Sequence, residues 1–266
     1  MDITFKRPAL EDRDTILKHL EERKLHGCER TFANVYLWAR FYNEGWAEIE
    51  GTAVFRTGQE GAYSYTYPIG AGDRKKVVEM LMEDAKEKGY PFQLHAVSKG
   101  EMEELESYFP GKFNVEWPRD LEDYVYETEK LINLSGKKYH GKKNHLNQFK
   151  AAYPDWKYET ITDENVEECF QMALSWRNHN GCEDDPEKNQ EMCVALNSLR
   201  LFKELHLKGG LLRVNGKVVA YTLGEPVCDD TFVVHIEKAY ADIRGAYTMI
   251  NQQFLEHEVK DYTYVN

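Results

Sequence analysis

The chain has 266 residues, of which 42% are hydrophobic and 13% aromatic, and its formal net charge is -12. This composition supports a buried core and excludes a disordered chain, while the acidic balance excludes bulk, non-specific binding of nucleic acid. The length fits one large or two ordinary domains. There is no apolar run of about 18 residues and no CxxC pair, so we expect a cytoplasmic protein with reduced cysteines, no secretory leader and no membrane span.

Hydrophobic periodicity and turn residues predict an ordered series of elements in the first half of the chain. Asp73 is the expected N-cap of the last helix of this series, and Gly89 is its expected end. In chain order we expect strand 3–7, helices 10–24 and 32–42, strands 46–49, 52–57 and 62–67, helix 74–88 and strand 92–97.

The second half of the chain shows the same series of elements. Thr162 or Asp163 is expected to cap its first helix, and Asn215-Gly216 is the strongest short turn signal in the sequence. The expected elements are strand 156–161, helices 163–178 and 187–207, strands 211–214, 217–223 and 231–238, helix 246–259 and strand 262–265.

The order strand, two helices, three strands, helix and strand therefore occurs twice. It predicts a mixed α/β fold class with two similar domains, residues 1–130 and 131–266. The expected linker, residues 126–135, runs into the most unusual stretch of the chain.

That stretch is a basic island, because no Asp or Glu occurs between Lys130 and Pro154. Lysines this close together repel one another, and an anion among them, such as a phosphate group, explains the clustering. The alternative is a helix face whose lysines are simply solvated. The basic side chains of the island are Lys130, Lys137, Lys138, His140, Lys142, Lys143, His145 and Lys150.

Motifs that would point to other chemistry are incomplete. The run from Gly136 to Lys142 fits G-x-x-x-x-G-K, but Lys143 follows where a phosphate loop needs Ser or Thr. The G-x-S-x-G motif of nucleophilic hydrolases does not occur in the sequence. His179 and Cys182 form a single cluster, whereas zinc sites usually need two spaced pairs, so no metal site is expected.

One strand near the end of the chain carries the candidate chemistry. Period-two alternation places Phe232, Val234 and Ile236 on one face of this strand. The same alternation places His235 and Glu237 together on the other face. Such a pair can bind or deprotonate an amine. The alternative is a satisfied polar pair at the surface of a sheet.

The helix after this strand opens at Arg244-Gly245-Ala246, and a helix N-terminus that follows a strand binds anions readily. The element order of each half resembles the GNAT acyltransferase fold, in which this helix binds a pyrophosphate. The signature there is roughly R/Q-x-x-G-x-G/A, and this chain has one glycine where two are usual. The resemblance implies that Arg244, Gly245 and Tyr247 lie where the donor phosphates bind.

Two tracts, residues 135–149 and 235–254, resemble the phosphatidylglycerol lysyltransferase C-terminal domain family. Members of this family are related to the Fem-type aminoacyltransferases, and the resemblance implies two tandem GNAT-like acyltransferase domains. Those relatives take an aminoacyl group from a charged tRNA. The family usually continues beyond the position of Asn266, so we expect the second domain to be truncated.

The resemblance implies transfer of an aminoacyl group from a charged tRNA, or another phosphate-bearing donor, to a small-molecule amine or hydroxyl. No cofactor is expected besides this donor. We expect His235 or Glu237 to accept the proton, and backbone N–H groups as far as Lys238 to stabilise the oxyanion. These three are the expected catalytic residues. The expected donor- or anion-binding residues are Lys137, Lys138, Lys142, Lys143, Asn144, Arg244, Gly245, Tyr247 and Asn251.

Two alternative functions remain open at the level of sequence. One is an N-acetyltransferase that uses acyl-CoA as its donor. The other is a non-catalytic module that binds RNA or a nucleotide, with bases stacked on aromatic residues beside the lysines. The aromatic residues available for such stacking are Tyr139, Phe149, Tyr153 and Trp156.

Overall fold

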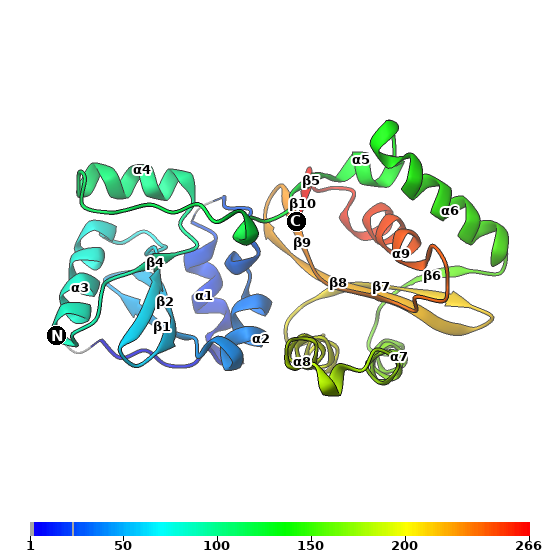
Figure 1. Ribbon diagram of the computed structural model, residues 1–266, viewed down its shortest axis with the longest axis horizontal. Coiled ribbons are helices and arrows are strands. Elements are labelled where there is room, and N and C mark those ends of the chain that lie inside the picture. Colours follow the sequence, from blue (N-terminus) through cyan, green and yellow to red (C-terminus); the bar gives the residue numbers. More distant parts are fainter. Residues whose placement is uncertain (1–2, 23) are drawn as a thin grey trace. The chain divides into compact units, whose positions relative to one another are not determined.

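A computed structural model describes residues 3–22 and 24–266 of the chain (Figure 1). The chain divides into two compact units, Met1–Asp123 (unit 1) and Tyr124–Asn266 (unit 2). Each unit has its own mixed β-sheet covered by helices. Among the described residues, no helix has the length and apolar character required to cross a membrane.

Unit 1 has a sheet with strand order β1-β2-β3-β4. Its first three strands are antiparallel, and β4 is parallel to β3. A single bridge between Lys6 and Trp46 places the N-terminal segment beside β1. The elements are α1 (Arg13–Leu20), α2 (Phe32–Tyr42), β1 (Gly45–Ile49), β2 (Thr52–Gln59), β3 (Ala62–Thr66), α3 (Arg74–Glu87), β4 (Leu94–His95) and α4 (Lys99–Tyr108), with short 3-10 turns at Leu10–Asp12, Cys28–Arg30 and Arg119–Leu121.

The core of unit 1 lies between its sheet and α3. Val54 and Tyr65 of the sheet pack with Val77 and Leu81, which are one helical turn apart on α3 and fully buried. The Asp73 carboxylate accepts a hydrogen bond from the backbone N–H of Lys76 and so begins α3 as predicted. This burial of one helix face fixes α3 against the sheet.

Unit 2 has a longer sheet with strand order β5-β10-β9-β8-β7-β6. Helices α5, α6 and α9 lie on one face of this sheet, and α7 and α8 lie on the other (Figure 1). The elements are β5 (Tyr126–Glu127), α5 (Thr128–Asn133), α6 (His140–Ala152), β6 (Lys157–Thr160), α7 (Val166–His179), α8 (Pro186–Arg200), β7 (Lys208–Val214), β8 (Lys217–Cys228), β9 (Thr231–Ala239), α9 (Ala246–Phe254) and β10 (Tyr264–Val265). Short 3-10 turns lie at Lys137–Tyr139 and Cys182–Asp184, and a π-helical turn, Leu255–Val259, continues α9.

The core on the α9 side of unit 2 contains large apolar residues from three elements. Phe149 of α6, Phe232 of β9, and Met249 and Phe254 of α9 are at most 1% exposed and belong to one cluster. Burial of side chains of this size stabilises a fold by about 1.5–3 kcal/mol each. The cluster therefore holds α6 and α9 on the same face of the sheet.

Strand β9 is irregular at two places that matter for the site. Parallel β10 pairs with it only at Thr231 and Phe232, and the next bond on this edge runs from Val234 N to Asn266 O (3.0 Å). On the other edge, Leu223 of β8 pairs with Ile236 whereas the next residue, Gly224, pairs with Val234. His235 is thus the extra residue of a β-bulge, and the end of β9 diverges from β10.

The predicted mixed α/β fold class is confirmed, and the predicted element order occurs in both units except that the first strand of unit 1 is reduced to a single bridge. Helix 32–42 matches α2, and the hairpin forms with positive φ at Asn215 (50°) and Gly216 (75°), as a type I′ turn requires. In each unit an antiparallel series of strands is followed by a helix and by a strand that pairs in parallel. The domain bounds 1–130 and 131–266 stay a prediction.

Several element predictions were wrong in extent. The strand predicted at 3–7 is a single bridge at Lys6, and the helix predicted at 10–24 ends at Leu20. Residue 23 of that prediction lies outside the described residues. The helix predicted at 187–207 ends at Arg200, where non-helical turns follow. The sequence analysis did not predict α4 or α5, and it considered a helix in the region of α6 only as the alternative interpretation of the basic island.

Candidate functional site

Glu237 is the most chemically distinctive residue of unit 2. It lies on β9, and Asn251 of α9 donates a hydrogen bond from Nδ2 to its Oε2 (2.9 Å). Burial raises the pKa of Glu237 to about 7, although the Asn251 bond and the charge of Lys142 on α6 act in the opposite direction. Residues from β9, α9 and α6 therefore meet around one carboxyl group that can take up or release a proton near neutral pH.

The prediction that His235 and Glu237 share a face of β9 is wrong. His235 Nε2 lies 3.0 Å from Glu225 Oε1 of β8, and Glu225 pairs across the strands with Val233. Val233 alternates with residues of the α9-side core, so it points to the opposite face. The bulge at His235 reverses the alternation and separates its side chain from that of Glu237.

Lys238 also lies away from Glu237. Its ammonium group pairs with the Glu191 carboxylate of α8 and lies 4.4 Å from the centre of the Trp176 ring of α7. Because α7 and α8 cover the face opposite α9, consecutive residues of β9 serve opposite faces of the sheet (Figure 1). The predicted catalytic set is thus divided, with Glu237 on one side and His235 and Lys238 on the other.

The apolar residues of β9 follow the prediction in part. Phe232 and Ile236 are buried, at 0% and 4% exposure, whereas Val234 is half-buried. Phe232 is a member of the α6–α9 core, and Val234 packs against it. The bulge explains why the three residues do not behave as one uninterrupted face.

The N-terminus of α9 is bounded by a glycine that also contacts α6. Gly245 is in the left-handed region (φ 88°), and no side chain caps the helix. A Cβ at Gly245 would lie 2.5 Å from the carbonyl oxygen of His145, so the glycine permits close approach of α6 to α9. Arg244 and Tyr247 are exposed beside it. Uncapped N–H groups at a helix start attract anions.

The basic island forms α6 and the 3-10 turn before it. Within α6 only Leu146 and Phe149 are buried, so its lysines are solvated as the alternative interpretation also required. The island nevertheless adjoins the N-terminus of α9 through Gly245. The side chains of the predicted anion-binding set that are exposed here are Lys137, Lys138, Lys142, Lys143 and Asn144.

The aromatic residues proposed as stacking platforms are not available as a group. Tyr139 is 5% exposed and Phe149 is fully buried in the core. Tyr153 and Trp156 are partly buried and pack against the same core. An RNA-binding module that stacks bases on all of these rings is therefore inconsistent with the structure.

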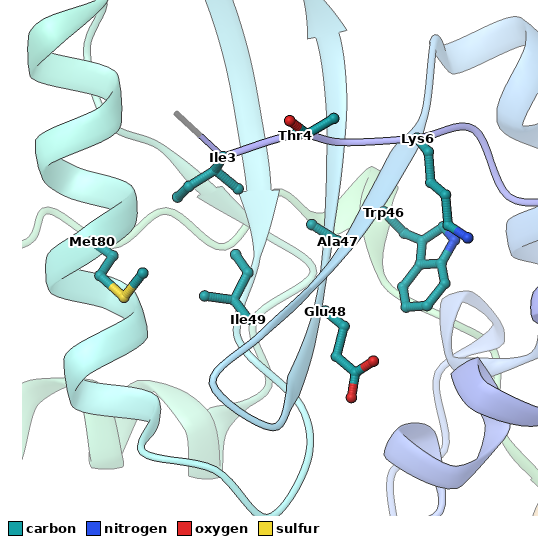
Figure 2. A pocket seen from close by; sticks show the side chains of 8 residues that line it. All are labelled: Ile3, Thr4, Lys6, Trp46, Ala47, Glu48, Ile49 and Met80. Carbon is teal, nitrogen blue, oxygen red and sulfur yellow. The ribbon is translucent and has the colours of Figure 1, made fainter. Parts of the chain in front are cut away.

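Two hollows of the described residues lie in unit 1 and contain none of the predicted site residues. The first, of about 400 Å³, lies between the N-terminal segment, β1 and α3, with Met80 at one side (Figure 2). Lys6 in this hollow already pairs with Asp12 and lies 5.1 Å from the centre of the Trp46 ring. The second, of about 500 Å³, is bounded by charged surface residues of α3 and by Lys112. The candidate site on β9 is therefore defined by the geometry of its side chains and by neither of these two hollows.

Sequence reasoning missed Glu225, Glu191 and Trp176 as neighbours of the predicted catalytic residues. Their positions depend on the register of β8 against β9 and on the way α7 and α8 cover the sheet. No local sequence pattern predicts the register of these strands or the way these helices cover the sheet. Asn251 was predicted as a donor- or anion-binding residue, and the structure places it next to Glu237 through the 2.9 Å hydrogen bond. The functional roles of all the site residues stay predictions.

Comparison with known proteins gives a family match over most of the chain. The model of the phosphatidylglycerol lysyltransferase C-terminal family matches residues 21–266, which confirms the resemblance of the two tracts. An uncharacterized protein of Mycoplasmoides gallisepticum is 29% identical over 130 residues, covering 47% of this chain. The chain matches only 40% of that relative's length.

Three solved structures are similar to this chain over all or nearly all of its length. A conserved protein of unknown function from Bacteroides thetaiotaomicron is 36% identical with a TM-score of 0.92, covering 100% of this chain and 90% of that one. The structure of L-PGS from Bacillus licheniformis is 15% identical with a TM-score of 0.66, covering 100% of this chain and 77% of that one. The C-terminal domain of a putative lysylphosphatidylglycerol synthetase from Agrobacterium fabrum is 15% identical with a TM-score of 0.60, covering 97% and 77%. The latter two share the fold.

Proposed function

Because the chain belongs to the phosphatidylglycerol lysyltransferase C-terminal family, we propose that unit 2 is an acyltransferase that moves an aminoacyl group. The donor is a charged tRNA or another activated, phosphate-bearing molecule, and the acceptor is an amine or a hydroxyl. The family and the fold support acyl transfer in general. The choice of donor and acceptor is part of the proposal, as is a cytoplasmic location.

Glu237 is the single observation that carries the proposal. A carboxyl group with a pKa of about 7 can accept a proton at neutral pH and return it, as a general base requires. The Asn251 amide holds the carboxylate in one orientation. It does so on the last part of β9, where the strand has separated from β10. Glu237 therefore combines a suitable pKa with a fixed position beside an open strand edge.

In the proposed reaction the acceptor nitrogen or oxygen attacks the carbonyl carbon of the donor. The bond from that carbon to the donor oxygen or sulfur breaks, and the acceptor proton passes to Glu237 directly or through water. Backbone N–H groups on the unpaired edge of β9, between residues 235 and 239, stabilise the negative charge on the carbonyl oxygen. No covalent intermediate with the protein is needed.

The donor phosphates bind where α6 adjoins the N-terminus of α9. Lys142 and Lys143 supply positive charge there, and the uncapped first turn of α9 supplies N–H groups. Lys142 is close enough to influence the pKa of Glu237, so phosphate binding and proton transfer take place near each other. The same helix N-terminus suits the pyrophosphate of coenzyme A, which keeps acyl-CoA as the second candidate donor.

A transfer assay tests this proposal. The protein is incubated with tRNA charged with radiolabelled amino acids, or with acetyl-CoA, together with mixtures of small amines and hydroxyl compounds. Glu237→Gln should lower transfer by roughly 10²- to 10⁴-fold because a proton acceptor is lost with little change in volume. Glu187→Gln on the exposed first turn of α8 is the matched control and should transfer like the wild type. Equal transfer by the two variants would remove Glu237 from the mechanism.

A further inference from the structure

We propose that the α7–α8 side of β9 is a binding site for a carboxylate group of the acceptor, formed by Lys238, Tyr221 and Trp176. This inference rests on the proposed function, because it places an acceptor next to Glu237. It assigns the acceptor to the class of amino acids and short peptides. The argument depends on four side chains and on the position of the open strand edge.

Lys238 is a buried cation whose ion-pair partner, Glu191, is about half-exposed. Its side chain is 7% exposed, whereas the side chain of its partner, Glu191, is 47% exposed. The ring of Trp176 lies against the ammonium group at 4.4 Å, which stabilises the charge without neutralising it. A half-exposed carboxylate on a helix can rotate into water, but Lys238 cannot follow it. The buried ammonium group then requires another anion.

Tyr221, the cross-strand partner of Lys238, supplies an unused hydrogen-bonding group. It is fully buried on β8, directly across from Lys238, and within the described residues its hydroxyl has no hydrogen-bond partner. Burial, and to a lesser extent the charges of neighbours that include Glu191, raise the pKa of this hydroxyl, so it stays protonated and can donate. A buried hydroxyl without a partner is destabilising, and a ligand that accepts a hydrogen bond from it would remove that cost.

Trp176 gives the site a fixed wall. Its Nε1–H donates to the carbonyl oxygen of Ala239 (2.9 Å), which holds the indole against the end of β9. The indole ring is therefore held in place beside the Lys238 ammonium group.

The group that already pairs with Lys238, the Glu191 carboxylate, also indicates that the ligand group is a carboxylate. The Glu191 side chain supplies the same chemical group that we assign to the ligand, and exchange of one carboxylate for another needs no rearrangement of the cation. The ligand would gain the Tyr221 hydroxyl as a second donor. A phosphate carries more charge than one ammonium group and one hydroxyl can satisfy, and it is usually matched by several cations or by arginine.

The position along β9 connects this site to the proposed base. Lys238 follows Glu237 directly in the strand, and successive residues of a strand are about 3.3 Å apart while pointing to opposite faces. The edge of β9 at this point is not covered by β10. An amino acid or dipeptide held by its carboxylate at Lys238 can therefore extend its amine around the open edge towards Glu237.

Binding of a dipeptide tests the site without any donor. Glycylglycine and its amide, glycylglycinamide, are titrated into the full chain, and the fluorescence of Trp176 is isolated by subtracting the response of Trp176→Phe. We expect a saturable change with glycylglycine and none with the amide. Glu191→Gln should bind glycylglycine several-fold more tightly, because the competing carboxylate is removed, and a misfolded protein cannot produce that gain.

Further variants decide the roles of the two donors. Lys238→Met should lose saturable binding, and Tyr221→Phe should weaken it by roughly 3- to 10-fold. Equal responses to the dipeptide and its amide, no response in Glu191→Gln, or stronger competition by inorganic phosphate than by acetate would each overturn the proposal. Transfer and glycylglycine binding are then measured side by side in every variant. Loss of transfer with binding retained therefore reports on the base, and loss of binding reports on this site.

Discussion

The two units share an order of elements but differ at the N-terminus of the helix that precedes the parallel strand. In unit 1 this helix is α3, and the Asp73 carboxylate accepts a hydrogen bond from Lys76 N (3.0 Å). In unit 2 it is α9, which begins after Gly245 with no side-chain cap. A carboxylate already neutralises the helix start in unit 1, whereas the equivalent position in unit 2 is open to an external anion.

The strands before these helices differ in the same sense. In both units the parallel pairing covers two residues, Tyr65 and Thr66 in β3 and Thr231 and Phe232 in β9. Strand β3 ends at Thr66, but β9 continues to Ala239 and carries Glu237 beyond the paired region. Unit 2 therefore differs from unit 1 by one extended strand, β9, and one uncapped helix, α9. These two features give the shared framework its candidate active site.

The largest expected effect is a pH dependence that belongs to unit 2. With a pKa of about 7, Glu237 is mostly protonated in acid, so transfer should rise about tenfold per pH unit up to about pH 7 and then level off. Initial rates measured from pH 5 to pH 9 check this. A flat profile below pH 7 would show that Glu237 is not the proton acceptor.

The same shift has a consequence for stability with the opposite sign. The pKa in the folded protein lies above the usual value of 4.5, so the folded state binds the proton more tightly than the unfolded state does. The free energy of unfolding should therefore fall as pH rises from about 4.5 through 7. Urea unfolding of wild type and Glu237→Gln across this range isolates the contribution, because only the wild type should show it.

A single methyl group added at Gly245 should disrupt the close packing of α6 against α9. Gly245→Ala places Cβ against the carbonyl oxygen of His145 at a positive φ, whereas Gly216→Ala has a similar φ (75°) and nothing within 4 Å. Both variants carry backbone strain, so their difference measures the contact. We expect Gly245→Ala to lose about 1–3 kcal/mol more in urea unfolding. Equal losses would mean that α6 moves aside freely.

The basic island should give a smaller, salt-dependent effect. Lys142→Ala with Lys143→Ala removes two exposed cations from α6, and we expect the affinity for bulk tRNA to fall by about tenfold. The slope of log affinity against log salt should fall by roughly 1–2. The control replaces Lys217 and Lys260, which are equally exposed lysines of unit 2, and should leave the slope unchanged. An unchanged slope in the α6 variant identifies the island as a solvated surface.

The smallest effect is expected in unit 1. Asp73→Ala removes the cap of α3 and should lower the free energy of unfolding of this unit by about 0.5–2 kcal/mol. Asp73→Asn keeps a capping oxygen and should lose less. Transfer activity should not change in either variant, and a loss of transfer would show that the N-terminus of α3 takes part in function.

Much of the framework could be predicted from sequence because its signals are local. The helix predicted at 32–42 matches α2, and Asn215-Gly216 correctly located the hairpin. Helix α6 was not predicted from periodicity because only Leu146 and Phe149 face the core, which is too sparse a pattern to indicate a helix. A short stretch of sequence does not show which of its residues will be buried by neighbouring elements.

The site was predictable only up to the bulge. Strict alternation placed His235 with Glu237, and one extra residue in β9 reversed that result. The bulge arises from the pairing of β9 with β8, so it depends on register. The ion pair of Lys238 with Glu191 likewise joins elements that are distant in the chain. Long-range pairing therefore decided which predicted residues stand together.

The place of β10 in the sheet has a consequence for how unit 2 folds during synthesis. Strand β10 lies between β9 and β5, yet residues 264–265 leave the ribosome long after Tyr126 and Glu127 of β5. Until then β5 has no neighbour to pair with, and the edge of β9 stays bare. Contacts between distant parts of a chain form slowly and leave strand edges open to wrong partners. We therefore expect the sheet of unit 2 to close last, in a step that follows translation of residue 265.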